Sequence, residues 1–261
     1  MAEHHNLYQR AVYYDIALAR DVSREVNFIR QAYRHYTGRE LRAALDLACG
    51  PGYHARTLAA QGVRAVGLDI RQEMLDLARE KAAAQGLSVT WLQGDMRAFR
   101  LDRPVDMALC MFDGLDALLS NADLLANFRT VSENLTPGGL YLIDLTHPRD
   151  CSYRDYGNYR YAGEGDGVQV EILWAVSPPE FDVAAGTVRV AVEMHVNDHG
   201  EEQVIADSAV ERLLDPQELV LLAQLSGCFE ATGWHGDYAL SQPLDNSPSS
   251  TRMIGILRKK G

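Results

Sequence analysis

Residues 45–55, LDLACGPGYHA, combine two glycines with polar side chains at a point where a buried strand gives way to a helix. Residues 45–48 have the apolar character of a strand, Gly50 and Gly52 predict a tight turn, and a helix is expected to open near Tyr53. Glycine lets a ligand approach the main chain closely, and a helix N-terminus supplies unpaired N–H groups and a partial positive charge. The stretch is therefore predicted to bind a cofactor.

A carboxylate follows this turn at the spacing of a dinucleotide site. Gly50, Gly52 and Ala55 satisfy the fingerprint G-x-G-x-x-G/A, and Asp69 lies nineteen residues after Gly50, at the end of the next predicted strand. There it could accept both hydroxyls of a ribose. Because several nucleoside-containing cofactors use the same crevice, an NAD(P)-dependent oxidoreductase and a purely structural glycine turn both remain open.

Three further features point away from a nicotinamide cofactor. Asp46 lies inside the strand before the turn, where a buried carboxylate needs a cationic ligand or backbone donors. Asp95, in Gly-Asp-Met after the third strand, should reach the same crevice and could accept an adenine amino group. Residues 135–139, Leu-Thr-Pro-Gly-Gly, predict a sharp turn into another buried strand.

Alternating strands and helices must position these residues. Apolar runs and amphipathic segments alternate from residue 63 to residue 145, which implies an α/β fold with a parallel sheet, right-handed crossovers and helices on both faces. The strands are expected at 63–69, 88–92, 105–112 and 140–145, and the helices at 71–86 and around 124–135.

The pattern changes after residue 145. Residues 146–167 are polar and rich in tyrosine and are predicted to form a long loop. Period-two segments then predict an antiparallel meander with one packed face, at 168–176, 188–196 and 203–213. A helix capped by Asp215 and two last strands should complete the sheet. We expect a helical N-terminal cap (1–40), a core (41–150 and 212–261) and an inserted loop and meander (151–211).

Composition limits the partners. The chain has 261 residues and a formal net charge of −11, which argues against a nucleic-acid partner. It has no apolar run near the roughly 20 residues that span a membrane and no apparent signal peptide. The four cysteines form no CxxC pair, as expected of a cytoplasmic protein. His4 and His5 lack partners at ligand spacing, so no metal site is expected.

Five motifs in order resemble those of the class I S-adenosylmethionine-dependent methyltransferases. They are LDLACGPG (45–52), GLD (67–69), GDM (94–96), the strand ending in Met111-Phe112-Asp113, and LTPGGLYLID (135–144). The resemblance covers residues 45–145 and 212–261 and implies a Rossmann-like, seven-stranded, mostly parallel sheet whose last strand runs antiparallel. The aromatic N-terminal segment and the β insertion are similar to small-molecule N-methyltransferases that act on amino sugars or glycine-like amines.

The resemblance also implies a cofactor site. The turn would lie against the methionyl and ribose parts, Asp69 would accept the ribose hydroxyls, and Asp95 with the Met96 backbone would bind adenine. Tyr14 could bind the methionyl carboxylate, or it could only pack on its helix. The implied residues are Tyr14, Asp46, Ala48, Gly50, Gly52, Asp69, Ile70, Asp95, Met96 and Met111. Ala48 and His54 depart from the family's commonest glycine pattern.

The implied reaction is direct displacement at the methyl carbon of S-adenosyl-L-methionine, with release of S-adenosyl-L-homocysteine. A neutral amine attacks well once deprotonated, whereas a hydroxyl or an acidic carbon needs a base, so transfer to nitrogen is favoured. The candidate catalytic residues are His147 and Asp113, and the candidate substrate contacts are Phe112, Thr146, Tyr153 and Tyr156. The alternatives are a backbone-bonded loop histidine, an ordinary Asp-Gly turn, and tyrosines that pack against the meander.

We therefore predict a methyltransferase that acts on a small-molecule acceptor, and a homodimer is compatible with this reading. The competing hypotheses are an NAD(P)-dependent oxidoreductase that uses the GxGxxA turn, and a family member that binds the cofactor without catalysis.

Overall fold

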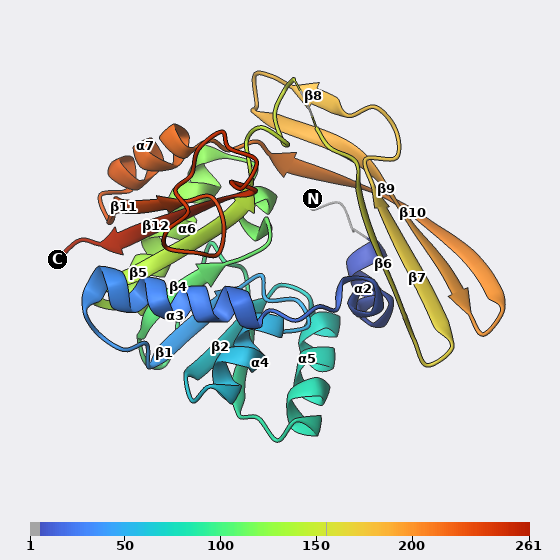
Figure 1. Cartoon of the computed structure of the whole chain (residues 1–261), viewed down its shortest axis with the longest axis horizontal. Coiled ribbons are helices and arrows are strands. Elements are labelled where there is room, and N and C mark those ends of the chain that lie inside the picture. Colours follow the sequence, from blue (N-terminus) through green and yellow to red (C-terminus); the bar gives the residue numbers. More distant parts are fainter. Residues whose placement is uncertain (1–5, 155) are drawn as a thin grey trace.

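A computed structural model describes residues 6–154 and 156–261, which form two β-sheets with helices around them (Figure 1). The larger sheet has seven strands in the order β11-β12-β5-β4-β1-β2-β3. Its strands are β1 (Ala43–Leu47), β2 (Arg64–Asp69), β3 (Val89–Gln93), β4 (Val105–Cys110), β5 (Leu135–Thr146), β11 (Phe229–His235) and β12 (Arg252–Lys259). Neighbours from β3 to β5 are parallel, and β12 is antiparallel to both of its neighbours. The expected α/β fold with an antiparallel last strand is confirmed.

Helices cover both faces of this sheet because each one carries an apolar stripe. On one face, α6 (Asn121–Asn134) and α7 (Pro216–Ser226) contribute Phe128 and Leu222 to one core cluster. On the other face, α3 (Ser23–Thr37) and α4 (Tyr53–Ala60) contribute Ile29 and Leu58 to a second cluster. The remaining helices are α1 (Asn6–Gln9), α2 (Ala11–Leu18), α5 (Gln72–Ala84) and a 3-10 helix, η1 (Gly114–Ala117).

The strand before the predicted site ends earlier than its apolar run suggests. Residues 105–112 were expected to be a strand, but β4 stops at Cys110. The next turn holds Phe112 and Asp113 at φ of 51° and 65°, a left-handed conformation that few side chains adopt. The sharp entry into a buried strand expected at 135–139 lies within β5. Leu135 is opposite Val105 but Leu140 is opposite Met107, and Gly138 has φ of 68° between them.

The second sheet is larger than the predicted meander and lies beside the first (Figure 1). Its strand order is β10-β9-β7-β6, and β8 pairs with β9. Its strands are β6 (Tyr159–Gly165), β7 (Val168–Trp174), β8 (Glu180–Asp182), β9 (Thr187–Asp198) and β10 (Glu201–Arg212). The prediction of one long loop over 146–167 is therefore wrong, because its last part is β6. The inward-facing positions of β6 are Tyr159, Tyr161 and Gly163, so its packed face lacks the aliphatic alternation that marks the other strands.

One face of the second sheet is buried against the N-terminal helices. Leu7 of α1 and Leu18 of α2 pack in one cluster with Val170, Ile172 and Met194. Helix α2 also contacts a helix that packs on the larger sheet, because Asp15 of α2 pairs with Lys81 of α5. Helices α1 and α2 therefore bridge the two sheets. Among residues 6–154 and 156–261, no helix is both long and apolar enough to cross a membrane.

Candidate active site

A cavity of about 540 Å³ lies between the carboxyl ends of the parallel strands, helices α1 and α2, and the inner face of the second sheet. Ligands of open α/β sheets bind at this edge, where the strand order reverses around β1. The predicted site residues that line the cavity are Tyr14, Asp46, Ala48, Gly50, Asp69, Ile70, Asp95, Met96, Met111, Phe112, Asp113, Thr146 and Tyr156. The described lining leaves out three predicted residues, Gly52, His147 and Tyr153.

Gly50 exposes its main chain to this cavity. It has φ of 51°, and a Cβ added there would meet no described atom within 4 Å. Its N–H donates to Asp69 at 2.8 Å, and the Arg71 N–H donates to the other oxygen of Asp69 at 2.8 Å. Asp69 is only 8% exposed, and this burial raises its pKa. Each carboxylate oxygen keeps a lone pair for a ligand hydroxyl.

Gly52 has a packing role instead of the predicted cofactor contact. It has φ of 76°, and a Cβ there would lie 2.3 Å from Cη2 of Trp91 and 3.3 Å from Cβ of Ala78. This glycine therefore makes room for the Trp91 indole at the start of α4. Nothing in the glycine fingerprint itself reveals this contact, because Trp91 comes from a strand thirty-nine residues further along the chain.

The irregular His54 has a structural explanation. Its Nε2 bonds to Glu25 of α3, and Glu25 also pairs with Arg20 at 3.2 Å. The imidazole therefore connects α4 to α3 where the commonest turn of the family has a glycine. Below the turn, Asp46 accepts the Ala55 N–H at 3.2 Å, and burial raises the pKa of Asp46 to about 6, against the opposing effect of His54.

The end of the cavity expected to bind adenine contains an arginine that the sequence analysis missed. Arg97 donates its Nε to Asp95 at 2.9 Å and pairs with Asp123 at 2.7 Å. The hydrogen bonds from Arg97 lower the pKa of Asp95. Asp95 is thus already an acceptor within the protein, and an adenine amino group would have to share it. Ile70 lies on the same rim, 59% exposed, and offers an apolar surface to a planar ring.

His147 is not placed to act as a base. Its Nε2 bonds to the Asp245 carbonyl at 2.9 Å, and its Nδ1 accepts the Arg149 N–H at 3.0 Å. Both ring nitrogens are therefore occupied, and the side chain lies outside the cavity lining. The alternative reading of a backbone-bonded loop histidine describes it correctly. Tyr153, which also lies outside the cavity lining, packs its ring against Phe181 at a centroid distance of 5.8 Å.

Replacing His147 with alanine is expected to lower the free energy of unfolding by about 1–2 kcal/mol, because two buried hydrogen bonds are lost. The affinity for S-adenosylhomocysteine should not change. Urea denaturation and calorimetry measure the two quantities, and His195→Ala, at a half-exposed position of β9, is the matched control. Lost methyl transfer with intact folding and ligand binding would restore His147 as a base.

Asp113 lines the cavity, but its carboxylate is held by the protein. It accepts the Thr146 N–H and pairs with Arg252 at 3.1 Å. Arg252 also pairs with the buried Asp144 at 2.8 Å. The network fixes the turn that presents Phe112, whose ring has the Arg20 guanidinium 4.4 Å from its centroid. Asp113 therefore positions the wall of the cavity, and the carboxylate expected to be catalytic is already bonded to Thr146 and Arg252.

The far wall of the cavity contains functional candidates that the sequence analysis did not single out. Glu211 of β10 accepts hydrogen bonds from the Tyr156 hydroxyl and from Nε1 of Trp174, the latter at 2.9 Å. Burial raises the pKa of Glu211 to about 7. Asp116 of η1 also lines the cavity, and burial, with Asp113 and Glu211 adding to the effect, raises its pKa well above the usual value.

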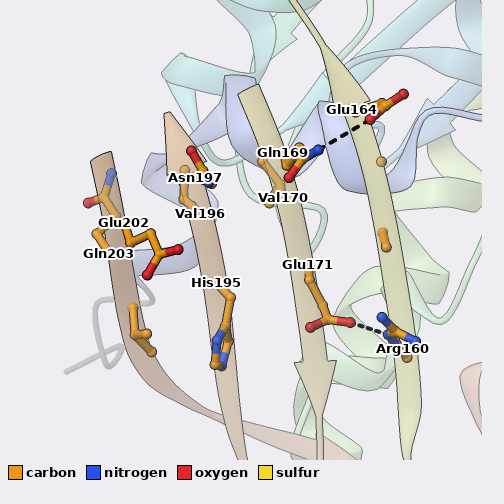
Figure 2. A pocket seen from close by; sticks show the side chains of 13 residues that line it. Arg160, Glu164, Gln169, Val170, Glu171, His195, Val196, Asn197, Glu202 and Gln203 are labelled. Atoms are coloured by element: carbon orange, nitrogen blue, oxygen red, sulfur yellow. Dashed lines mark hydrogen bonds and ion pairs between the residues drawn. The ribbon is translucent and has the colours of Figure 1, made fainter. Parts of the chain in front are cut away.

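A second hollow, about 830 Å³, lies on the outer face of the second sheet (Figure 2). Its side chains pair with each other, as Arg160 does with Glu171 and Gln169 with Glu164. Because successive strand residues face opposite sides, Glu171 on this outer face alternates with the inward-facing Ile172. The groove is therefore separated from the glycine turn by the sheet itself, and we place no reaction there.

Metal ligands do not gather in the described part of the chain. Among residues 6–154 and 156–261, no group of three or more His, Cys, Asp or Glu side chains could hold a metal ion. His4 and His5, which the sequence analysis considered, lie outside the described residues.

A family model matches the part of the chain that contains the glycine turn. Residues 44–139, which run from β1 into β5, match a family model described as a methyltransferase domain. This segment is therefore similar to a methyltransferase domain. The match includes the glycine turn, Asp69, Asp95 and the Phe112 turn, so the resemblance read from the motifs is confirmed.

Curated proteins similar to this chain are named as methyltransferases. The dTDP-3-amino-3,4,6-trideoxy-alpha-D-glucopyranose N,N-dimethyltransferase of Streptomyces venezuelae is 31% identical over 125 residues, 48% of this chain and 51% of that protein. A dTDP-3-amino-3,6-dideoxy-alpha-D-glucopyranose N,N-dimethyltransferase of Streptomyces fradiae is 30% identical over 52% of this chain and 57% of its own length. The chain thus spans about half the length of the curated relatives it matches.

Solved structures match over nearly the whole chain, including the second sheet. A S-adenosylmethionine-dependent methyltransferase from Clostridium acetobutylicum has a TM-score of 0.79 at 21% identity and covers 98% of this chain and 100% of its own. Streptomyces venezuelae DesVI has a TM-score of 0.76 at 24% identity and covers 95% of this chain and 97% of its own. These likenesses establish the shared fold.

Proposed function

We propose that this protein transfers the methyl group of S-adenosyl-L-methionine to the nitrogen of a small-molecule amine. The observation that supports this most strongly is the continuity of one cavity. It runs from the glycine turn and Asp69, through Phe112, to an aromatic wall that contains the half-buried Glu211. A cofactor at the turn and an acceptor at the wall would meet in one enclosed space, and enclosure and alignment are what a displacement reaction needs from a protein.

In this proposal the chain's own residues bind and orient the cofactor. Gly50 and Asp46 lie at the methionyl end, Asp69 accepts the ribose hydroxyls, and Ile70 with the Met96 backbone contacts adenine. Tyr14 keeps its proton because burial raises its pKa, so its hydroxyl can donate to the methionyl carboxylate. The bound cofactor supplies an activated methyl group on a sulfonium, which leaves the protein little covalent chemistry to perform.

For the acceptor we propose an amino sugar. Two of the curated relatives are named as dimethyltransferases of 3-amino sugars linked to dTDP, and the acceptor end of this cavity is lined by tyrosines, a tryptophan and carboxyl groups. Aromatic faces and carboxylates together favour a cation such as a protonated amine. We further propose that the cap (1–40) and the insertion (151–211) enclose the acceptor against the core (41–150 and 212–261).

The cellular location of the protein and its partners are also proposals. All four cysteines are free, which supports a cytoplasmic location, and the net charge of −11 opposes binding to nucleic acid. A homodimer stays a prediction. The two competing hypotheses are an NAD(P)-dependent oxidoreductase and a non-catalytic cofactor-binding protein. They are less favoured because residues 44–139 match a methyltransferase domain and the acceptor wall contains the half-buried carboxylate of Glu211.

The reaction can be tested by incubating the protein with methyl-labelled S-adenosylmethionine and dTDP-linked amino sugars. We expect mass spectrometry to show label on the amine and an equal amount of S-adenosylhomocysteine. The matching dTDP-sugars with a hydroxyl in place of the amine are the control and should remain unlabelled. Label on the hydroxyl sugars alone would contradict transfer to nitrogen, and binding of the cofactor without turnover of any amine would favour the non-catalytic reading.

A further inference from the structure

We propose that Glu211 is a catalytic residue that binds the ammonium group of the acceptor and removes one of its protons before methyl transfer. This inference rests on the proposed function. It assigns the deprotonation of the acceptor amine to one residue, because the residues proposed to bind the cofactor do not perform that step. An amine that is protonated has no lone pair with which to attack, so a proton acceptor next to it is required.

The register of the second sheet places Glu211 on the cavity side. Glu211 pairs with Val188 of β9, and Ala209, two residues earlier in β10, pairs with Val190. Val188 and Val190 are fully buried, and residues two apart share one face of a strand. Glu211 and Ala209 both line the cavity that contains the glycine turn, so the carboxylate faces the space where an acceptor would lie.

Two donors fix the carboxylate in place. The Tyr156 hydroxyl donates to Oε2, and Nε1 of Trp174 donates to Oε1 at 2.9 Å. Each oxygen uses one lone pair in this way and keeps another for a substrate N–H. Both donors also line the cavity. Tyr156 and Trp174 are therefore positioning residues that hold the carboxylate among aromatic rings.

The surrounding groups favour a cation at this point. The titratable groups that act on Glu211 or respond to its charge are Tyr8, Asp113, Asp116, Cys151, Tyr156 and Tyr161. Burial raises the pKa of Asp116 well above its usual value, which favours the neutral form of this carboxyl. Arg252, a cation near this end of the cavity, is already paired with Asp113 and Asp144. Arg20, which lines the cavity, is paired with Glu25. A substrate ammonium would therefore be the unpaired positive charge beside Glu211.

The other carboxylates of the cavity are less suited to the step. Asp69 holds two backbone N–H groups at the cofactor turn, Asp95 is bonded to Arg97, and Asp113 is paired with Arg252. Glu211 is held only by neutral donors, and burial brings its pKa to about 7. A carboxylate with a pKa near neutrality can accept a proton in one step and release it to solvent in the next.

The proposed step balances as follows. One ammonium N–H bond breaks, its proton bonds to the Glu211 carboxylate, and the electron pair stays on nitrogen. The neutral amine then forms a bond to the methyl carbon while the carbon–sulfur bond breaks and its electron pair goes to sulfur. The products are a methylated ammonium, S-adenosylhomocysteine and a protonated Glu211, which loses its proton to water.

The test uses sinefungin, a cofactor analogue in which an amine-bearing carbon replaces the methylated sulfur, and S-adenosylhomocysteine, which has no such amine. Calorimetry with the full chain gives the ratio of the two dissociation constants. In Glu211→Gln this ratio should shift by about tenfold against sinefungin, because one of two facing opposite charges is removed at close range. Glutamine can still accept the Trp174 N–H through its amide oxygen and can donate its amide NH2 to the Tyr156 hydroxyl oxygen. Glu202→Gln, an exposed change on the same strand, should leave the ratio unaltered.

The pH dependence adds a readout that a merely structural role would not produce. In the unmodified protein the preference for sinefungin should increase as pH rises through about 7, because Glu211 ionises there, and Glu211→Gln should lack this increase. An equal ratio in the two proteins at every pH would overturn the proposal. Failure of the unmodified chain to bind either compound would instead overturn the proposed function.

Discussion

Alanine in place of Gly52 is expected to lower the free energy of unfolding by about 2–4 kcal/mol, the sum of an overpacked contact and a left-handed backbone angle. The added Cβ would lie 2.3 Å from the Trp91 ring, and φ at this position is 76°. The ring cannot simply slide away along the sheet, since a Cβ at Gly67 would lie only 2.4 Å from Cζ3 of the same indole. Urea denaturation followed by circular dichroism measures the change.

Gly50→Ala is the matched control because it makes the same substitution two residues away. Gly50 also has a left-handed angle, of 51°, but its Cβ would project into space free of described atoms. We expect a loss of only about 1 kcal/mol in stability and a marked loss of affinity for the cofactor, because the main chain of the turn is no longer open. Equal destabilisation by the two variants would contradict the packing role of Gly52.

Replacing Asp69 with alanine should weaken the binding of S-adenosylmethionine by about 1–3 kcal/mol, the usual effect of losing buried hydrogen bonds to a charged group. Asp69 holds the Gly50 N–H at 2.8 Å and offers its remaining lone pairs to the cavity. Calorimetry measures the loss, and Asp76→Ala on the exposed side of α5 is the control, since Asp76 bonds only to its helix neighbours. An unchanged affinity in Asp69→Ala would remove this residue from the site.

The seven-stranded sheet could be predicted because its strands and helices carry their own signals. Buried parallel strands are nearly continuous apolar runs, and Asp215, Pro216 and Gly227 mark the ends of α7 as expected, with the Asp215 side chain accepting two backbone N–H groups. The second sheet was harder to predict. Strand β6 was missed because its inward-facing positions are tyrosines and a glycine, which in sequence resemble a loop.

The cofactor end of the cavity was also accessible to prediction, because its residues follow the ends of parallel strands. Asp46, Gly50, Asp69, Asp95 and Phe112 come together from β1 to β4 for that reason alone. What the motifs could not show were side-chain contacts between distant segments. The Trp91 ring against Gly52, Arg97 beside Asp95, and His54 against Glu25 each depend on three-dimensional packing that no spacing records.

The position of Glu211 could be predicted from the sequence, but its surroundings could not. Period-two alternation predicts a strand at 203–213, and Ala209 and Glu211 then fall on one face of that strand. A carboxylate on the packed face of a sheet needs a partner or a function, so this signal was present in the sequence. The importance of Glu211 could be recognised only from the pairing of β9 with β10 and from the tyrosines that line the same cavity.

The most direct test of the central claim is calorimetry of the unmodified protein with S-adenosylmethionine and, separately, with NAD. The account predicts saturable binding of S-adenosylmethionine at one site per chain and no comparable binding of NAD, because the cavity contains Asp69, which we propose to bind ribose, and lies in the segment that matches a methyltransferase domain. Binding of NAD without binding of S-adenosylmethionine would contradict it.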